Sequence, residues 1–152
     1  MKFLNNYSNR ELNIWAELIL DILVSFYFFP KIFPLIIDGQ LYSDALVGII
    51  ATSIIISIIY SIFVFGAINT LTKREEKDER DYVYELKSYR ISNIISQVSI
   101  YLLISLIVFN PINQVRLNEF TAPMIAMLLL IITLLSSTGK SLTQLFNYRK
   151  NI

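Results

Sequence analysis

The sequence contains no cysteine and no histidine among its 152 residues. Disulfide bonds, thiolate metal sites and thiol redox chemistry are therefore excluded, and so are imidazole acid–base catalysis and the commonest protein ligand for metals. Charge is scarce too, because Asp, Glu, Lys and Arg make up 16% of the chain, against about 25% in an ordinary soluble domain. We expect a non-enzymatic protein with no cofactor and no metal site, although its carboxylates and hydroxyls could still serve a hard cation or a proton relay.

Apolar residues form 55% of the chain and fall in long runs. Residues 45–72, 91–115 and 120–139 contain no charged side chain, and each run exceeds the roughly 18 residues that indicate a membrane-spanning helix. Residues 12–37 form a fourth run, which is interrupted by Glu17, Asp21 and Lys31. Acids in its centre and bulky aromatic residues near its end are not typical of a cleavable signal peptide, so we expect this run to span the membrane as well.

These runs predict an all-α fold, a bundle of four transmembrane helices within a single integral membrane domain over residues 1–152. The predicted spans are 12–36, 45–68, 91–110 and 122–140. Residues 8–11, which read S-x-x-E, form a capping box at the start of the first helix, and Pro30 and Pro34 are expected to bend or end it. Asn110 and Pro111 should end the third span, and Pro123 suits the first turn of the fourth.

Lys and Arg lie almost entirely on one side of these spans. Eleven of the 13 occur in the N-terminal tail, in the loop between the second and third spans, or after the fourth span, whereas Lys31 and Arg116 occur in the two other loops. Because cytoplasmic loops carry the excess of Lys and Arg, we expect both termini to be cytosolic.

The stretch KREEKDERDYVYELKSYR, residues 73–90, holds almost half of the charged residues. Tyr82, Val83, Leu86 and Tyr89 recur within it at helical spacing, which predicts a charged cytosolic helix that runs into the third span. The fourth span should extend into the cytosol in the same way. We interpret this block as a solvated helix that fixes the topology, as a docking surface for a cytosolic partner or for the C-terminal helix, or as a cation site. The residues of the predicted surface are Asp78, Glu79, Arg80, Asp81, Glu85, Lys87, Tyr148 and Arg149.

Glu17 and Asp21 lie one turn apart on the predicted first span. An acid within hydrocarbon is costly and is a functional hypothesis by default. Lys140 and Arg90 stand at the inner ends of their spans, at a similar depth, so an ion pair across the bundle is the leading interpretation. A proton or cation site and simple exposure at the membrane interface are the alternatives.

Serines recur at close helical spacing in the second and third spans. Small polar residues at such spacing let helix backbones approach closely, which favours helix packing over a hydrophilic pathway. The serines are Ser53, Ser57 and Ser61 in the second span and Ser92, Ser96 and Ser99 in the third.

Three segments, DERDYVYELKSYRISN, NRELNIWAELILDILV and LTQLFNYRKNI, resemble a group of small prokaryotic four-span membrane proteins. That group carries a DERD-type charged loop, an E-x-K-x-x-R run entering the third span and an aromatic–basic ending. The resemblance covers most of the chain and implies a four-span architecture in a prokaryotic inner membrane, without an activity; Glu17 and Asp21 lie outside its pattern. The residues that carry it are Asp78, Glu79, Arg80, Asp81, Glu85, Arg90, Gln144, Tyr148 and Arg149.

Two functions follow from these features. The first is a non-enzymatic membrane protein, a homo-oligomer whose cytosolic charged helix is an interaction or regulatory surface for a protein partner. The alternative is a small proton- or cation-coupled transporter that uses Glu17 and Asp21. An enzyme would need Asp78, Asp81 and Glu85 to hold a divalent cation, and no phosphotransfer or hydrolase motif accompanies them. The net charge of +1 gives no general attraction to nucleic acid.

Overall fold

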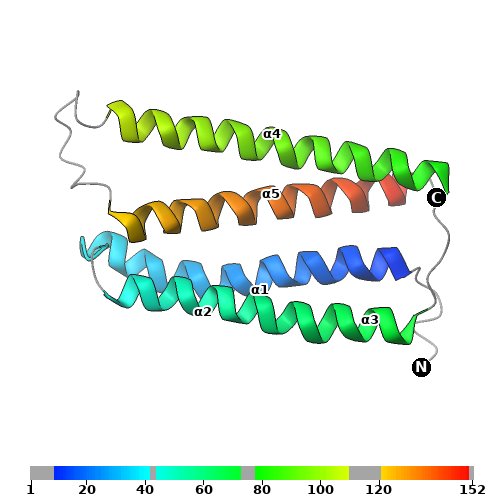
Figure 1. Cartoon of the computed structure of the whole chain (residues 1–152), viewed down its shortest axis with the longest axis horizontal. Coiled ribbons are helices and arrows are strands. Elements are labelled where there is room, and N and C mark those ends of the chain that lie inside the picture. Colours follow the sequence, from blue (N-terminus) through cyan, green and yellow to red (C-terminus); the bar gives the residue numbers. More distant parts are fainter. Residues whose placement is uncertain (1–8, 42–43, 73–77, 110–120, 151–152) are drawn as a thin grey trace.

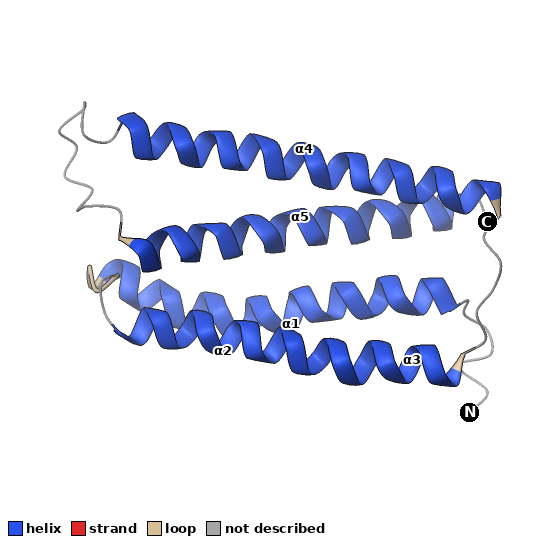
Figure 2. Ribbon diagram, viewed as in Figure 1, coloured by secondary structure: helices blue, strands red, loops and turns tan. Residues whose placement is uncertain are grey.

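The computed structural model describes residues 9–41, 44–72, 78–109 and 121–150, and these residues are almost entirely helical (Figure 1, Figure 2). Helices α2, η2 and α3 follow one another without a break and form one long helix, in which η2 is a π-helical segment. The elements are α1 (Asn9–Ile37), α2 (Asp44–Tyr60), η2 (Ser61–Phe65), α3 (Gly66–Leu71), α4 (Glu79–Phe109) and α5 (Ala122–Lys150).

Four helical stretches in the described part of the chain are long and apolar enough to cross a membrane. They contain between 28 and 31 residues each, and 28 residues at 1.5 Å per residue make a helix of about 42 Å. The hydrocarbon core of a bilayer is roughly 30 Å thick, so each of these helices is long enough to cross such a layer. The predicted all-α class with four apolar helices is confirmed.

The end of α1 differs from the prediction. The helix does not end at Pro30 or Pro34, both of which are exposed, and it continues to Ile37. The chain then turns away at Gly39, whose φ of 65° is a left-handed conformation that costs glycine little. The N–H of Gln40 then donates to the carbonyl of Leu35 at 2.9 Å, which closes the helix with a Schellman motif.

Several predicted boundaries fall outside the described residues, namely the capping serine Ser8, the pair Asn110 and Pro111, and residues 73–77 of the charged helix. The described part of that helix begins at Glu79 and runs through the charged block into the apolar run without interruption. Pro123 lies in the first turn of α5, where its missing N–H breaks no helical hydrogen bond.

Helix α5 is the central element of the fold. It packs against α4 on one side and against α1 and α2 on the other, whereas α4 packs against α5 alone among the described elements (Figure 1). The main apolar core therefore lies between α1, α2 and α5, and α4 stands at the edge. The buried residues of this core are Phe28, Ile32, Leu46 and Met127.

Helix α1 and the long helix α2–η2–α3 are joined by two polar contacts. The hydroxyl of Tyr60, the last residue of α2, donates to the carbonyl of Ala16 at 3.0 Å. Just beyond α3, the hydroxyl of Thr72 accepts a hydrogen bond from the side-chain amide of Asn9. The π-helical segment lies between these two contacts.

Small residues form the contact between α4 and α5. The hydroxyls of Ser92 and Ser96 lie 2.7 and 2.8 Å from the hydroxyl of Ser136, which itself donates to the carbonyl of Ser92 at 3.0 Å. One turn further along α5, a Cβ placed on Gly139 would lie 2.5 Å from Cδ1 of Ile95. Ser136 reaches the backbone of α4 because serine is small, and Ile95 of α4 packs over Gly139. Of the serines predicted to pack in the third span, Ser92 and Ser96 take part in this contact.

Replacing Gly139 by leucine is expected to force α4 away from α5. Overpacking of a tight contact typically costs about 1–3 kcal/mol, so the free energy of unfolding in detergent should fall by that amount. Gly48→Leu is the matched control, because nothing lies within 4 Å of a Cβ at Gly48. The close-contact interpretation is wrong if the two variants are equally stable.

Candidate functional site

One end of the molecule gathers most of its charged side chains. There α1 and α4 begin and α5 ends (Figure 1), and we call this the charged end. A cavity of about 140 Å³ lies between the three helices, and we call it the polar chamber. It is lined by Arg10, Asn13, Ile14, Glu17, Asp81, Glu85, Tyr89, Lys140, Gln144 and Tyr148.

An ion pair between α1 and α5 forms one wall of the polar chamber. Nζ of Lys140 lies 3.0 and 2.9 Å from the two carboxylate oxygens of Glu17, and the hydroxyl of Ser141 lies 3.3 Å from one of them. The Lys140 and Glu17 side chains are 18% and 31% exposed. Partial burial strengthens the attraction, but desolvation offsets much of it, so such a pair orients helices more than it stabilises them.

The structure separates the two cations that were expected near the acids. Lys140 contacts Glu17, whereas Arg90 is exposed on α4 and lines a different groove with Lys87. The reason lies in the rotation of α4, which turns Asp81 and the fully buried Ser88 inward and Arg90 outward.

Asp21 lies one turn beyond Glu17 and is 6% exposed. The hydroxyl of Thr138 on α5 lies 3.4 Å from its carboxylate. Within the described residues Asp21 forms no ion pair. The two acids on α1 therefore differ in kind, since one is paired with a lysine and the other is a buried carboxylate beside a hydroxyl.

A second carboxylate joins three helices at the charged end. Asp81 pairs with Arg10 of α1, accepts a hydrogen bond from the hydroxyl of Tyr148 of α5 at 2.7 Å, and accepts another from the backbone N–H of Asp78 at 3.0 Å. The ring of Tyr84 packs edge-to-face on that of Tyr148, with centroids 5.3 Å apart. Asp81 is thus a clamp that holds the start of α4 against α1 and α5.

The residues of the predicted interaction surface fall into two groups, one inside the protein and one on its surface. Asp81, Glu85 and Tyr148 line the polar chamber, so they face the interior of the protein. Asp78, Glu79, Arg80, Lys87 and Arg149 are exposed. Exposed Arg149 nevertheless lies 5.4 Å from the ring of Trp15, a distance typical of a cation–π contact.

Sequence reasoning missed Arg10 and Asn13 as site residues. The sequence nevertheless contains a signal for them, because Arg10, Asn13 and Glu17 are spaced i, i+3 and i+7 and so lie on one face of α1.

No group of three or more acids that could hold a metal ion occurs in the described part of the chain. The acids Asp78, Asp81 and Glu85, which an enzyme would need, do not form such a group.

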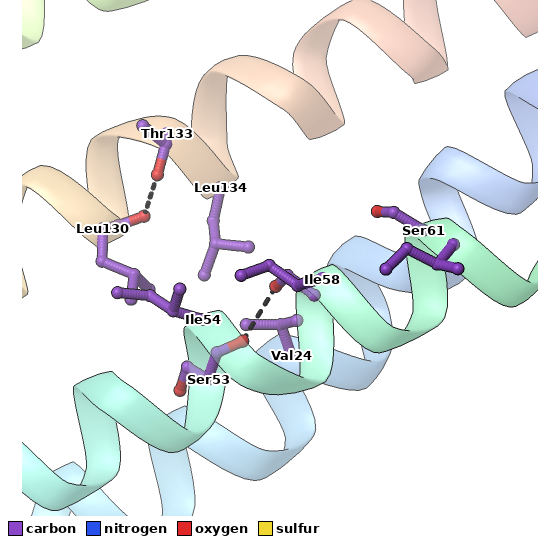
Figure 3. Close-up of a pocket in the computed structure, with 10 residues that line it drawn as sticks. Val24, Ser53, Ile54, Ile58, Ser61, Leu130, Thr133 and Leu134 are labelled. Carbon is purple, nitrogen blue, oxygen red and sulfur yellow. Dashed lines mark hydrogen bonds between the residues drawn. The ribbon is translucent and has the colours of Figure 1, made fainter. Parts of the chain in front are cut away.

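A second recess, of about 410 Å³, lies between α1, α2, η2 and α5 (Figure 3). The predicted serine row of the second span, Ser53, Ser57 and Ser61, lines it among mostly apolar neighbours. Ser53 and Ser57 donate their hydroxyl protons to backbone carbonyls one turn back, at 2.8 and 2.9 Å. Apolar side chains form most of the lining, so the recess presents a mainly apolar surface.

Comparison of the chain with protein-family models, with curated proteins and with solved structures found no match. The resemblance to four-span prokaryotic proteins stays a prediction, and function has to be inferred from the geometry of the site.

The ion pair can be tested with a double-mutant cycle in detergent. Glu17→Gln and Lys140→Gln should each lower the free energy of unfolding, and the double variant should lose less than their sum, because contacting residues couple by about 0.5–3 kcal/mol. Glu17→Gln combined with Arg90→Gln is the control and should be additive. Additivity with Lys140, or coupling with Arg90, would contradict the pairing.

Proposed function

We propose that this chain is a non-enzymatic protein of a prokaryotic inner membrane that crosses the bilayer four times and binds another protein at its charged end. The excess of Lys and Arg in the N-terminal tail, the central loop and the C-terminal segment supports a cytosolic placement of that end. A second copy of the chain and a cytosolic protein are the two partners to be distinguished by experiment.

One observation carries this proposal, namely that the start of α4 has its apolar face outside. We call Tyr82, Val83 and Leu86 the apolar stripe; they are 51%, 47% and 68% exposed. Tyr89, which has the same helical spacing, lines the polar chamber instead. The opposite face, which is polar, is turned toward the polar chamber. A surface helix of a soluble protein shows the reverse arrangement. An exposed apolar patch rimmed by polar residues marks an interaction site, and charged Glu79 and Lys87 flank this one.

The clamp explains why α4 keeps this orientation without a partner. Asp81 is held by Arg10 from α1 and by Tyr148 from α5, so the polar face cannot turn outward without breaking both contacts. Helix α4 packs on α5 alone among the described elements, which leaves the apolar stripe accessible from the side. The stripe is therefore presented in a fixed direction.

The partner can be detected by cross-linking in native membranes. A photoreactive side chain at Leu86 should yield an adduct with a second copy or with another protein, because the apolar stripe is covered in the complex. Leu71 is the control position, since it is 66% exposed and ends α3 at the same charged end. Adducts of equal yield at both positions, or no protein adduct at Leu86, would contradict the proposal.

A proton- or cation-coupled transporter is the second candidate, and the buried carboxylate of Asp21 favours it. Acids in a spanning helix mark proton relays and ion paths, and Asp21 has a hydroxyl but no cation in direct contact among the described residues. Glu17 is less suited to this role, because Lys140 already neutralises it.

Transport can be measured in liposomes that contain a pH-sensitive dye. If Asp21 carries the coupled ion, wild type should show proton or cation flux under an imposed gradient, and Asp21→Asn should abolish it. Asp44→Asn is the control, because Asp44 is an exposed acid at the start of α2. Absence of flux in wild type, or unchanged flux in Asp21→Asn, would reject this second function.

A further inference from the structure

One turn beyond the apolar stripe, α4 forms a groove with α5 at the charged end. The groove has a volume of about 640 Å³, within the roughly 300–1,000 Å³ of typical ligand pockets. Two cations on α4 and several apolar side chains line it. We call it the basic groove, and its main residues are Lys87, Arg90, Ile91, Leu142, Phe146 and Asn147.

In the described part of the chain, the cations of the basic groove have no acid beside them. No Asp or Glu lines the groove, and neither Lys87 nor Arg90 forms an ion pair within the described residues. Other cations of the charged end are engaged, since Arg10 pairs with Asp81 and Lys140 pairs with Glu17. An anion is therefore the complementary ligand for Lys87 and Arg90.

The position of the groove along α4 and α5 indicates which kind of anion it could bind. Arg90 is the last charge of the charged block, and the charge-free run begins at Ile91. On α5 the charge-free run ends at Gly139, shortly before Leu142 and Phe146, which are 53% and 66% exposed. The groove thus lies at the border between the apolar part of the helices and their charged ends, with cations and apolar side chains side by side.

We propose that the basic groove binds an anionic phospholipid, with its phosphate on Lys87 and Arg90 and the start of its acyl chains on Ile91, Leu142 and Phe146. Basic pockets between transmembrane helices at the cytoplasmic side bind anionic headgroups, and the guanidinium of arginine matches phosphate geometry. The proposal rests on the membrane placement given under Proposed function, and its two cations lie one turn further along α4 than Val83 and Leu86 of the apolar stripe.

Native mass spectrometry of the full chain in detergent tests this assignment. Titration with phosphatidylglycerol should give a bound lipid at concentrations about tenfold lower than titration with phosphatidylcholine. The reason is that the two cations attract a headgroup with a net negative charge, which phosphatidylcholine lacks. In the double variant Lys87→Gln, Arg90→Gln this preference should disappear. The control Lys31→Gln, Lys150→Gln loses the same charge outside the groove and should keep it.

Three results would overturn the lipid assignment. Equal binding of both lipids by wild type would show that the groove does not select an anion. Equal loss of preference in the control variant would show a general charge effect. Displacement of phosphatidylglycerol by excess glycerol phosphate would show a site for a soluble anion. Fluorescence of Trp15, the single tryptophan, reports whether each variant is folded.

The same variants separate this proposal from the protein-binding function. If the Lys87→Gln, Arg90→Gln variant loses phosphatidylglycerol but still cross-links through Leu86, the lipid site is supported and stands apart from the protein site. If it loses the protein adduct and keeps its lipid preference, the two cations belong to the protein partner and the lipid proposal is wrong.

Discussion

The close contact between α4 and α5 is the constraint on which the rest of this structure depends. Helix α4 packs along its length on α5 only, among the described elements, and the hydroxyls around Ser136 and the small Gly139 let the two helices come close. One wall of the polar chamber, the apolar stripe and half of the basic groove belong to α4. All three would be lost if larger residues held the two helices apart.

Polar contacts then decide how the packed helices are rotated and shifted. Lys140 with Glu17 sets α5 against α1, and Asp81 with Arg10 and Tyr148 sets α4 against both. Lipid is as apolar as leucine, so apolar side chains alone discriminate poorly between rotations of a spanning helix. Buried polar contacts supply that discrimination more than they supply stability.

Much of the fold could be predicted from the sequence, because charge-free runs are long and distinct. The site could be predicted only in part. The positions of Glu17, Lys140 and Arg90 along their spans predicted a similar depth for all three side chains. They could not show which of the two cations pairs with Glu17, because that depends on the rotation of α4. The stripe of Tyr82 and Leu86 has the spacing of a buried face, yet the structure buries the face of Asp81 instead. Pro30 and Pro34 do not end α1, which continues to Ile37 and closes at the left-handed Gly39.

The π-helical segment in the second span has a consequence for rotational phase. In a regular α-helix each residue turns by about 100°, so Tyr60 and Thr72 would stand roughly 120° apart around the axis. The π-helical turn at η2 contains one more residue than an α-helical turn for the same rotation. It therefore removes about 100° of the difference between Tyr60 and Thr72. Tyr60 can therefore reach Ala16 while Thr72 reaches Asn9. The segment therefore corrects the rotational phase, so that the long helix keeps the same side toward α1 from Tyr60 to Thr72.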